Sequence, residues 1–158
     1  MVVRPLTDDD RAWMVATLEQ GWGTTTVARL GELIDAAPLS GFVVAEGDGR
    51  IGLLTYVERD DAIEVVTIQA LRRGRGVGWA LMDAVHAFAV ERNASRIWLI
   101  TTNDNGRALR FYQRWGLDLC RLIRNGVEAS RLVKPSIPVV GADGIPIRHE
   151  LEFERILR

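Results

Sequence analysis

Apolar and polar residues alternate along the middle of the chain in a way that predicts three consecutive strands. Apolar, β-branched runs cover residues 42–46, 51–58 and 62–71. The first two runs flank Gly47-Asp48-Gly49-Arg50, and an Asp-Gly pair between apolar runs is typical of a hairpin turn. Asp60-Asp61 then turns the chain into the third run. We therefore expect an antiparallel meander of three strands.

The apolar spacing changes after this meander, where a helix is predicted. One stripe at helical spacing is formed by Val77, Leu81, Ala84, Val85 and Phe88. A further apolar run at 96–102 predicts a strand after the helix. A strand, a crossover helix and a second strand imply a parallel pair, here between 62–70 and 96–102. The predicted sheet is therefore mixed.

The first 40 residues carry weaker patterns. Residues 2–4 predict a short strand, and Thr7 followed by three aspartates predicts a helix start with Thr7 as its N-cap. The stretch 20–37 leaves two alternatives open. Its apolar spacing fits a helix, whereas the β-branched run Thr24-Thr25-Thr26-Val27 favours an extended chain.

The tail predicts two strands joined by a long loop. Residues 117–123 form an apolar run, and 134–146 are rich in proline and glycine, which marks a loop. Apolar and charged residues then alternate from 147 to 154, as in a strand with two different faces. We expect His149 on the apolar face, as a core or edge histidine without a catalytic role. The face expected in water carries Glu150, Glu152 and Glu154.

Composition limits the class of protein. A chain of 158 residues is expected to form one domain, 1–158, and its 47% hydrophobic and 26% charged residues are typical of a soluble globular protein. The net charge of −1 argues against nucleic acid as the main partner. No apolar run approaches the roughly 20 residues of a membrane span, and an export pattern is absent, so we expect a cytoplasmic location. With Cys120 as its single cysteine and two histidines, the sequence argues against a disulfide and a metal site.

The most distinctive chemistry lies between the third strand and the following helix, which are joined by Arg72-Arg73-Gly74-Arg75-Gly76-Val77-Gly78. Glycines permit positive φ, and a helix start offers unpaired N–H groups and the positive end of its dipole. With arginines beside it, this turn predicts a phosphate site. The sequence patterns of dinucleotide folds and of nucleoside triphosphatases both fail here. The alternative is a glycine-rich turn whose arginines are merely solvated.

A second segment, residues 103–117, predicts a short helix with a polar start and an aromatic end. Asn105 is placed to cap this helix, and Gly116 stands where a left-handed C-terminal residue belongs. One side of the helix carries Ala108, Phe111 and Tyr112.

Together the two segments resemble the two signatures of the GNAT superfamily of acetyl-CoA-dependent N-acetyltransferases. The first signature corresponds to Arg73-x-x-Gly76-x-Gly78. The second matches at Asn105, Ala108, Phe111, Tyr112 and Gly116, with Leu117 where phenylalanine is usual. The resemblance covers residues 62–119. It implies an α/β fold of the α+β type, the GNAT fold: a central mixed, mostly antiparallel twisted sheet with one splayed parallel strand pair, flanked by helices.

The resemblance also implies where acetyl-CoA binds, in a wedge between the two parallel strands. The pantetheine arm would pair with the main chain of Ile68, Gln69, Ala70 and Leu71. The pyrophosphate would be held by the amides of Arg73, Gly74, Arg75, Gly76, Val77 and Gly78. The cofactor arm would also contact Asn105, with Ala108 on the same helix.

Direct transfer of an acetyl group from a thioester to an amine needs a proton acceptor for the amine and a proton donor for the leaving sulfur. Tyr112 matches the family's tyrosine and is the expected general acid; the alternative is a ring that only packs on the cofactor. Glu64 is the expected base, because it stands on the cofactor strand and, at period two, shares a side with Val66 and Ile68. Deprotonation through ordered water is the alternative.

The acceptor is expected to be a primary amine of a small molecule, with protein amines as the alternative. In the resembled fold, the region after the first strand often walls the acceptor pocket, which makes Trp22 a candidate lining residue. Asn103 is assigned to the same pocket. A non-catalytic acyl-CoA sensor on the same scaffold stays open as a second function, and a homodimer is a further expectation.

Overall fold

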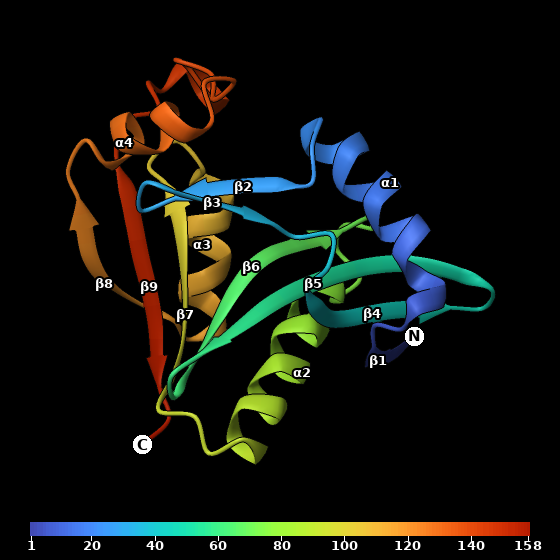
Figure 1. Cartoon of the computed structure of the whole chain (residues 1–158). Coiled ribbons are helices and arrows are strands. Elements are labelled where there is room, and N and C mark those ends of the chain that lie inside the picture. The colour runs from blue at the N-terminus through green and yellow to red at the C-terminus, as the bar shows by residue number, and fades with distance from the viewer. The chain divides into compact units, whose positions relative to one another are not determined.

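The computed structural model describes all residues, 1–158 (Figure 1). The chain falls into two compact units. The first unit contains residues 1–26, 35–97 and 157–158. The second contains residues 27–34 and 98–156. None of the helices is both long and apolar enough to cross a membrane.

The first unit contains an antiparallel sheet with strand order β1-β4-β5-β6. Its elements in chain order are β1 (Val2–Pro5), the short 3-10 helix η1 (Asp8–Asp10), α1 (Arg11–Trp22), β4 (Ser40–Glu46), β5 (Gly49–Arg59), β6 (Ala62–Ala70) and α2 (Val77–Glu91). The predicted meander is β4, β5 and β6, and the predicted first strand and helix start are also present. These sequence predictions are confirmed.

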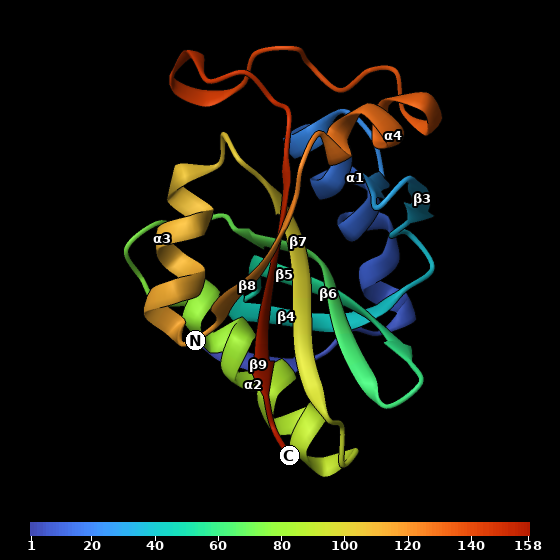
Figure 2. The same ribbon diagram turned by 90° about the vertical axis from the view of Figure 1, so that its left-hand side faces the viewer.

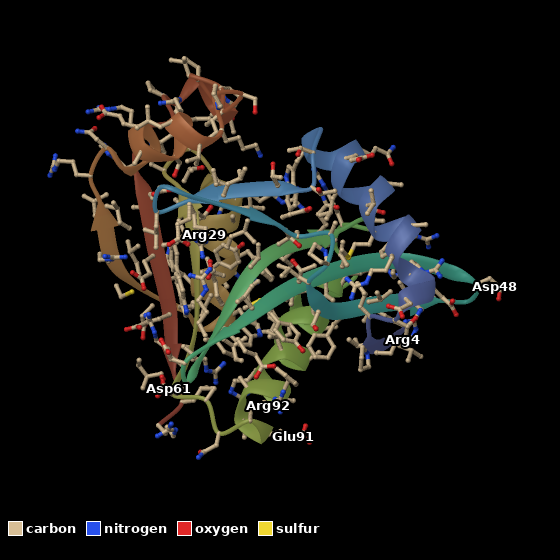
Figure 3. All side chains as sticks on the ribbon, in the orientation of Figure 1. Arg4, Arg29, Asp48, Asp61, Glu91 and Arg92 are labelled. Carbon is tan, nitrogen blue, oxygen red and sulfur yellow. The ribbon has the colours of Figure 1, made fainter.

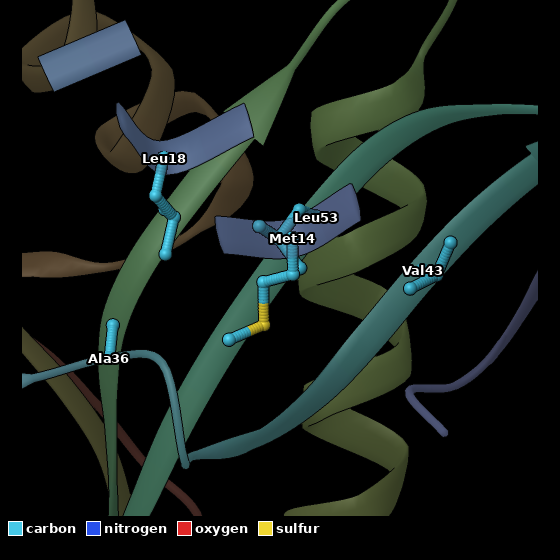
Figure 4. Close-up of a cluster of buried hydrophobic side chains, with 5 residues drawn as sticks. All are labelled: Met14, Leu18, Ala36, Val43 and Leu53. Atoms are coloured by element: carbon cyan, nitrogen blue, oxygen red, sulfur yellow. The ribbon is translucent and has the colours of Figure 1, made fainter. Parts of the chain in front are cut away.

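The two helices α1 and α2 cover opposite faces of this sheet. Leu53 of β5 packs in a buried cluster with Met14 and Leu18 of α1, as Figure 4 shows. The preceding residue, Gly52, faces α2 instead, because a Cβ built there would overlap the side chain of Val77. Successive residues of a strand point to opposite faces, so the two contacts lie on different sides of the sheet.

A β-bulge in β6 breaks the strict alternation of faces that was expected along this strand. Thr55 pairs with Thr67, but the next residue of β5 pairs with Val65, so Val66 is the extra residue. Cross-strand partners point to the same face, and Glu64 pairs with Val57, two residues after Thr55. Glu64 therefore shares a face with Thr67, and the prediction that it shares a side with Ile68 is wrong.

The second unit contains the strands β7, β9 and β8 in that order, with β8 and β9 antiparallel. Its helix α3 lies beside the strands of this unit (Figure 2). The ring of Tyr112 on α3 lies 5.7 Å from that of Phe153 on β9. The elements from 96 onward are β7 (Arg96–Thr102), α3 (Gly106–Trp115), β8 (Asp118–Ile123), α4 (Gly126–Val133), the 3-10 turn η2 (Ala142–Gly144) and β9 (Glu150–Ile156).

Of the two alternatives left open for residues 20–37, the structure adopts the extended chain, and the helix is wrong: the apolar residues whose spacing fitted it, Val27, Leu30, Leu33 and Ile34, lie in a hairpin. α1 continues to Trp22, and a hairpin follows, formed by β2 (Thr26–Arg29) and β3 (Glu32–Asp35). The β-branched run after Thr24 therefore enters a strand, as its stiff side chains favour.

The last strand differs from its sequence pattern, because its acidic face is not in water. Glu150 is 1% exposed and Glu152 is 6% exposed. Glu152 is paired with Arg121, whose Nε lies 2.7 Å from its Oε2. The expectation that these glutamates face solvent is wrong. Alternation identifies two faces of a strand, but it cannot tell which neighbouring segments cover them.

Candidate functional site

The glycine turn between β6 and α2 has the backbone that its sequence predicts. Gly74 has φ +70 and Gly76 has φ +73, a region that favours glycine. Gly76 is the N-cap of α2, no side chain caps the helix, and the first turn closes with Ala80 N donating to Gly76 O at 2.9 Å. The N–H groups before Ala80 therefore stay open to an anion.

Three arginines flank this turn, and a single carboxylate holds two of them. Glu46, at the end of β4, accepts from Arg72 Nη1 at 2.9 Å and from Arg75 Nη2 at 2.6 Å. Arg73 is exposed and makes no ion pair. Of the three positive charges expected beside the phosphate site, only that of Arg73 is left without an acidic partner.

The space above the turn is open. A Cβ built on Gly74 or Gly76 would meet nothing within 4 Å. The main chain reaches the turn through the end of β6, where Ile68 and Gln69 are half-buried and Ala70 is exposed. Leu71 N then donates to Ile51 O at 2.9 Å, which fixes the chain at the entrance to the turn.

Polar side chains of β6 lie on the face that α1 covers. Glu64 is almost fully buried, with 1% of its surface exposed. On the same face, the hydroxyls of Thr67 and Thr55 are hydrogen-bonded at 2.7 Å. Gln69 lies beside Gly21, next to Trp22, which ends α1 and is 47% exposed. The structure thus brings Gln69 and the last turn of α1 together.

In the second unit, α3 begins and ends as predicted. The Asn105 side chain accepts from Ala108 N at 3.3 Å, and Gly116 ends the helix with φ +108. Tyr112 lies on the buried side of this helix with 8% of its surface exposed, and burial raises its pKa to about 12. Its hydroxyl makes no hydrogen bond within the protein.

Asn103 follows β7 and uses its side-chain amide to hold a distant segment. Its Nδ2 donates to Pro146 O at 2.9 Å, and its Oδ1 accepts from the amides of Arg148 and His149, each at 2.9 Å. These bonds fix the segment just before β9. His149 in turn accepts from Asn125 N through Nδ1 at 2.9 Å, so its ring has a structural partner.

Glu150 is a second side chain that holds distant segments together, a clamp that no sequence pattern predicted. Both carboxylate oxygens accept from Leu30 N, at 3.1 and 3.3 Å, and Ser130 Oγ donates to Oε2 at 3.0 Å. This one buried side chain therefore joins the β2–β3 turn and α4 to β9. The partners lie 120 and 20 residues away in the chain, which is why no local pattern reveals them.

A polar pocket of about 300 Å³ lies at the opposite end of β5 and β6 from the glycine turn. Figure 3 labels two of its residues, Asp61 in the β5–β6 turn and Arg92 after the last turn of α2. Its arginines are already paired, Arg92 with Glu58 at 3.1 Å and Arg158 with Asp61 at 3.4 Å. None of the predicted site residues lines this pocket.

Comparisons with known proteins agree on one family. The model of the acetyltransferase (GNAT) family matches residues 8–117. YxbD of Bacillus subtilis is 38% identical over 137 residues, which are 86% of this chain and 86% of that protein. The streptothricin acetyltransferase of Streptomyces lavendulae is 40% identical over 86 residues, 51% of this chain and 46% of the relative. A Bacillus subtilis acetyltransferase solved in complex with CoA has a TM-score of 0.69 at 15% identity, over 99% of this chain and 98% of the other.

Proposed function

Because the chain belongs to the GNAT family of acetyltransferases, we propose that it transfers the acetyl group of acetyl-CoA directly to a primary amine of a small molecule. The family and the fold expected from the two signatures are both confirmed. We assign the activity to one N-acetyltransferase domain spanning residues 1–158.

The glycine turn at the start of α2 is the observation that carries this proposal. Its two positive-φ glycines, its uncapped helix start and the open space above it fit the diphosphate of CoA. In the proposal, the amides from Arg73 to Gly78 hold the diphosphate and the unpaired guanidinium of Arg73 adds a positive charge. The pantetheine arm runs along the main chain from Ile68 to Leu71.

The helix α3 contributes the other proposed contacts with the cofactor. Asn105 uses its side-chain oxygen to cap Ala108, which leaves its NH2 group to donate to the arm. Ala108 is half-buried, and its small side chain lets the arm approach the helix.

Tyr112 is proposed as the general acid. Acetyl-CoA supplies an acetyl group activated as a thioester; the amine nitrogen bonds to the carbonyl carbon and the carbon–sulfur bond breaks. Because burial raises the pKa of Tyr112 to about 12, its phenol is protonated at neutral pH. The hydroxyl has no partner within the protein, so its proton is free to pass to the leaving sulfur.

Glu64 is proposed as the proton acceptor for the amine. Its carboxylate is buried on the α1 face of β6, where water is largely excluded. A carboxylate in this position receives the ammonium proton directly or through an ordered water, and the neutral amine then attacks.

Trp22 and Asn103 complete the proposed acceptor site. Trp22 lies at the exposed end of α1, while Asn103 positions the segment before β9. The similarity to streptothricin acetyltransferase, a relative named for a small-molecule acceptor, supports a small molecule over a protein amine.

Release of free CoA from acetyl-CoA in the presence of a panel of primary amines tests this proposal. The panel contains streptothricin, aminoalkanols, alkylamines and a peptide with a free N-terminus. We expect the amount of free thiol to increase with time only when an amine is present. The exposed thiol of Cys120 adds a constant background of one thiol per protein, which is subtracted. A protein that binds CoA but releases no thiol with any amine would instead be a sensor.

A further inference from the structure

The side-chain amide of Gln69 stands out because its oxygen is buried and accepts no hydrogen bond. It is the one buried side-chain nitrogen or oxygen of residues 1–158 without a partner. Leaving a buried acceptor unpaired destabilises a folded protein by roughly 1–3 kcal/mol, so such groups are rare and call for an explanation.

A glycine makes room for this amide. A Cβ built on Gly21 of α1 would overlap Nε2 of Gln69. Gly21 lies within the helix and does not have positive φ, so its backbone does not require glycine. Glycine inside a helix is less favourable than alanine by roughly 1 kcal/mol. Both residues therefore reduce stability while keeping an unpaired amide at the end of α1.

The amide lies on the face of β6 where the proposed base is found. Gln69 pairs with Leu53, and Glu64 and Thr67 share its face across the bulge. Thr67 stands between Glu64 and Gln69 on this face and is already bonded to Thr55, whereas the side-chain oxygen of Gln69 is an unused acceptor. The other face of the sheet carries α2, whose first turn is the proposed diphosphate site.

We propose that the side-chain oxygen of Gln69 binds the acceptor by accepting a hydrogen bond from a second N–H or O–H group of the amine substrate. The proposal rests on the acetyltransferase function given above. Gln69 is half-buried, and the last torsion of a glutamine is broad, so the oxygen can turn towards a ligand at little cost. The preferred substrates are then polar amines with a second donor, rather than simple alkylamines.

Two pairs of probes test this specificity. Wild-type protein is compared with 5-amino-1-pentanol and pentylamine, which differ only in the hydroxyl donor. We expect kcat/KM to favour the aminoalkanol by about tenfold, the usual consequence of leaving a buried acceptor unpaired in the poorer complex. Gln69→Met should abolish this preference, whereas Gln69→Glu, which accepts but does not donate, should retain it.

Gly21→Ala tests the role of the Gln69 side chain without replacing Gln69 itself. The added methyl displaces the amide, so the preference for the aminoalkanol should fall as in Gln69→Met. The melting temperature should stay the same or rise, because alanine favours the helix. Gln20→Met, at an exposed glutamine one residue earlier in α1, should leave both properties unchanged.

A binding readout decides the question even where the probes are acetylated too slowly to measure. In CoA-loaded protein, the side-chain NH2 resonances of Gln69, identified by their loss in Gln69→Met, should shift on titration with 5-amino-1-pentanol. Pentylamine should shift them at least several-fold less.

Equal responses to the two probes, or an unchanged preference in Gln69→Met, overturn the proposal. The proposal is also overturned if Gln69→Met weakens CoA binding and changes nothing else, since the group that donates to the Gln69 oxygen would then belong to the cofactor and not to the amine. Absence of thiol release in wild type refutes the enzymatic function separately.

Discussion

Burial sets the protonation state of the residue on which the proposed chemistry depends most. The ring of Tyr112 packs against those of Phe111 and Phe153, with centroids 5.5 and 5.7 Å away. Burial disfavours the charged phenolate, so the pKa rises and the proton is retained across the physiological range. A phenol that stays neutral is in the protonation state that a general acid needs, since its proton is present when negative charge develops on the leaving sulfur.

Replacing Tyr112 with phenylalanine removes this proton and keeps the ring. We expect kcat for acetyl transfer to fall by about 10²-fold, while the dissociation constant for CoA stays within twofold. In wild type, kcat should show no loss from tyrosine deprotonation as the pH rises through 10, because the folded pKa is about 12. A Tyr112→Phe enzyme with wild-type kcat would leave the ring with a packing role only.

Glu46 reduces the positive charge available at the phosphate site, because it forms ion pairs with Arg72 and Arg75. A bound anion must compete with this carboxylate for the two guanidinium groups. Exposed ion pairs of this kind contribute only about 0.2–1 kcal/mol, so we expect Glu46→Gln to tighten CoA binding roughly threefold and to steepen its salt dependence. Calorimetric titration with CoA at two salt concentrations measures both.

Asp48→Asn is the matched control for this substitution, since Asp48 is exposed in the β4–β5 turn, two residues after Glu46, and pairs with no arginine. It removes the same charge without freeing a guanidinium. Weaker CoA binding in Glu46→Gln would mean that Glu46 shapes the turn rather than competing with the ligand.

At the scale of elements, local pattern predicted the pieces that carry the cofactor site. The change from period two to period 3.6 located β6 and α2, and the cap residues Asn105 and Gly116 fixed both ends of α3. These features are local, because each depends on residues within a few positions of one another. The bulge at Val66 left no such mark, since one extra residue in a β-branched run does not change its composition.

The clamp at Glu150 is an element-scale feature that can be measured. Glu150→Ala leaves Leu30 N and Ser130 Oγ without their partner, and we expect it to lower the free energy of unfolding by about 2–4 kcal/mol. Chemical denaturation followed by fluorescence checks this. Ser130→Ala should lower the free energy of unfolding by about 1 kcal/mol. Glu128→Ala, at an exposed position of α4, should leave it almost unchanged. Equal stability of the Glu150 and Glu128 variants would contradict the clamp.

At the scale of the whole molecule, stability depends on a buried carboxylate near the start of the chain. Asp10 is fully buried and accepts from Arg4 at 2.7 Å, Arg50 at 2.7 Å and the Thr7 amide at 2.9 Å. The hydrogen bond from Arg4, with those from Thr7 and Arg50, holds the pKa of Asp10 far below its usual range in spite of its burial. These bonds join β1 and η1 to β5.

A carboxyl group whose pKa is lowered by folding stabilises the fold fully only at a pH at which the same group is also ionised in the unfolded chain. The contribution of Asp10 is therefore complete above its ordinary pKa of 3.8 and is lost as the pH falls below it. We expect Asp10→Asn to lower stability at pH 7 by about 3 kcal/mol and to flatten the loss of stability between pH 5 and pH 2. Asp9→Asn, at the exposed neighbour, should keep the wild-type pH profile.

The sequence predicted the family and the glycine turn, but it placed the charged side chains less well. The three aspartates after Thr7 suggested only helix capping, and the last strand suggested a wet acidic face. Asp10 does bond to Thr7 at the helix start, but Asp10 and Glu150 each also bond to a distant partner, Arg50 at 40 residues and Leu30 at 120, and both are buried. Such pairings are fixed by tertiary packing and leave no local signal.

Every proposed role in this protein depends on CoA binding at the glycine turn, and a comparison of two variants tests that binding directly. Gly76 has φ +73 in the turn, and Gly47 has φ +59 in the β4–β5 hairpin. Valine at either position is strained by about 1–2 kcal/mol. In a calorimetric titration with CoA, we predict that Gly76→Val loses at least tenfold in affinity and that Gly47→Val, with a similar loss of stability, binds as wild type does. Equal CoA affinity of the two variants would contradict the account.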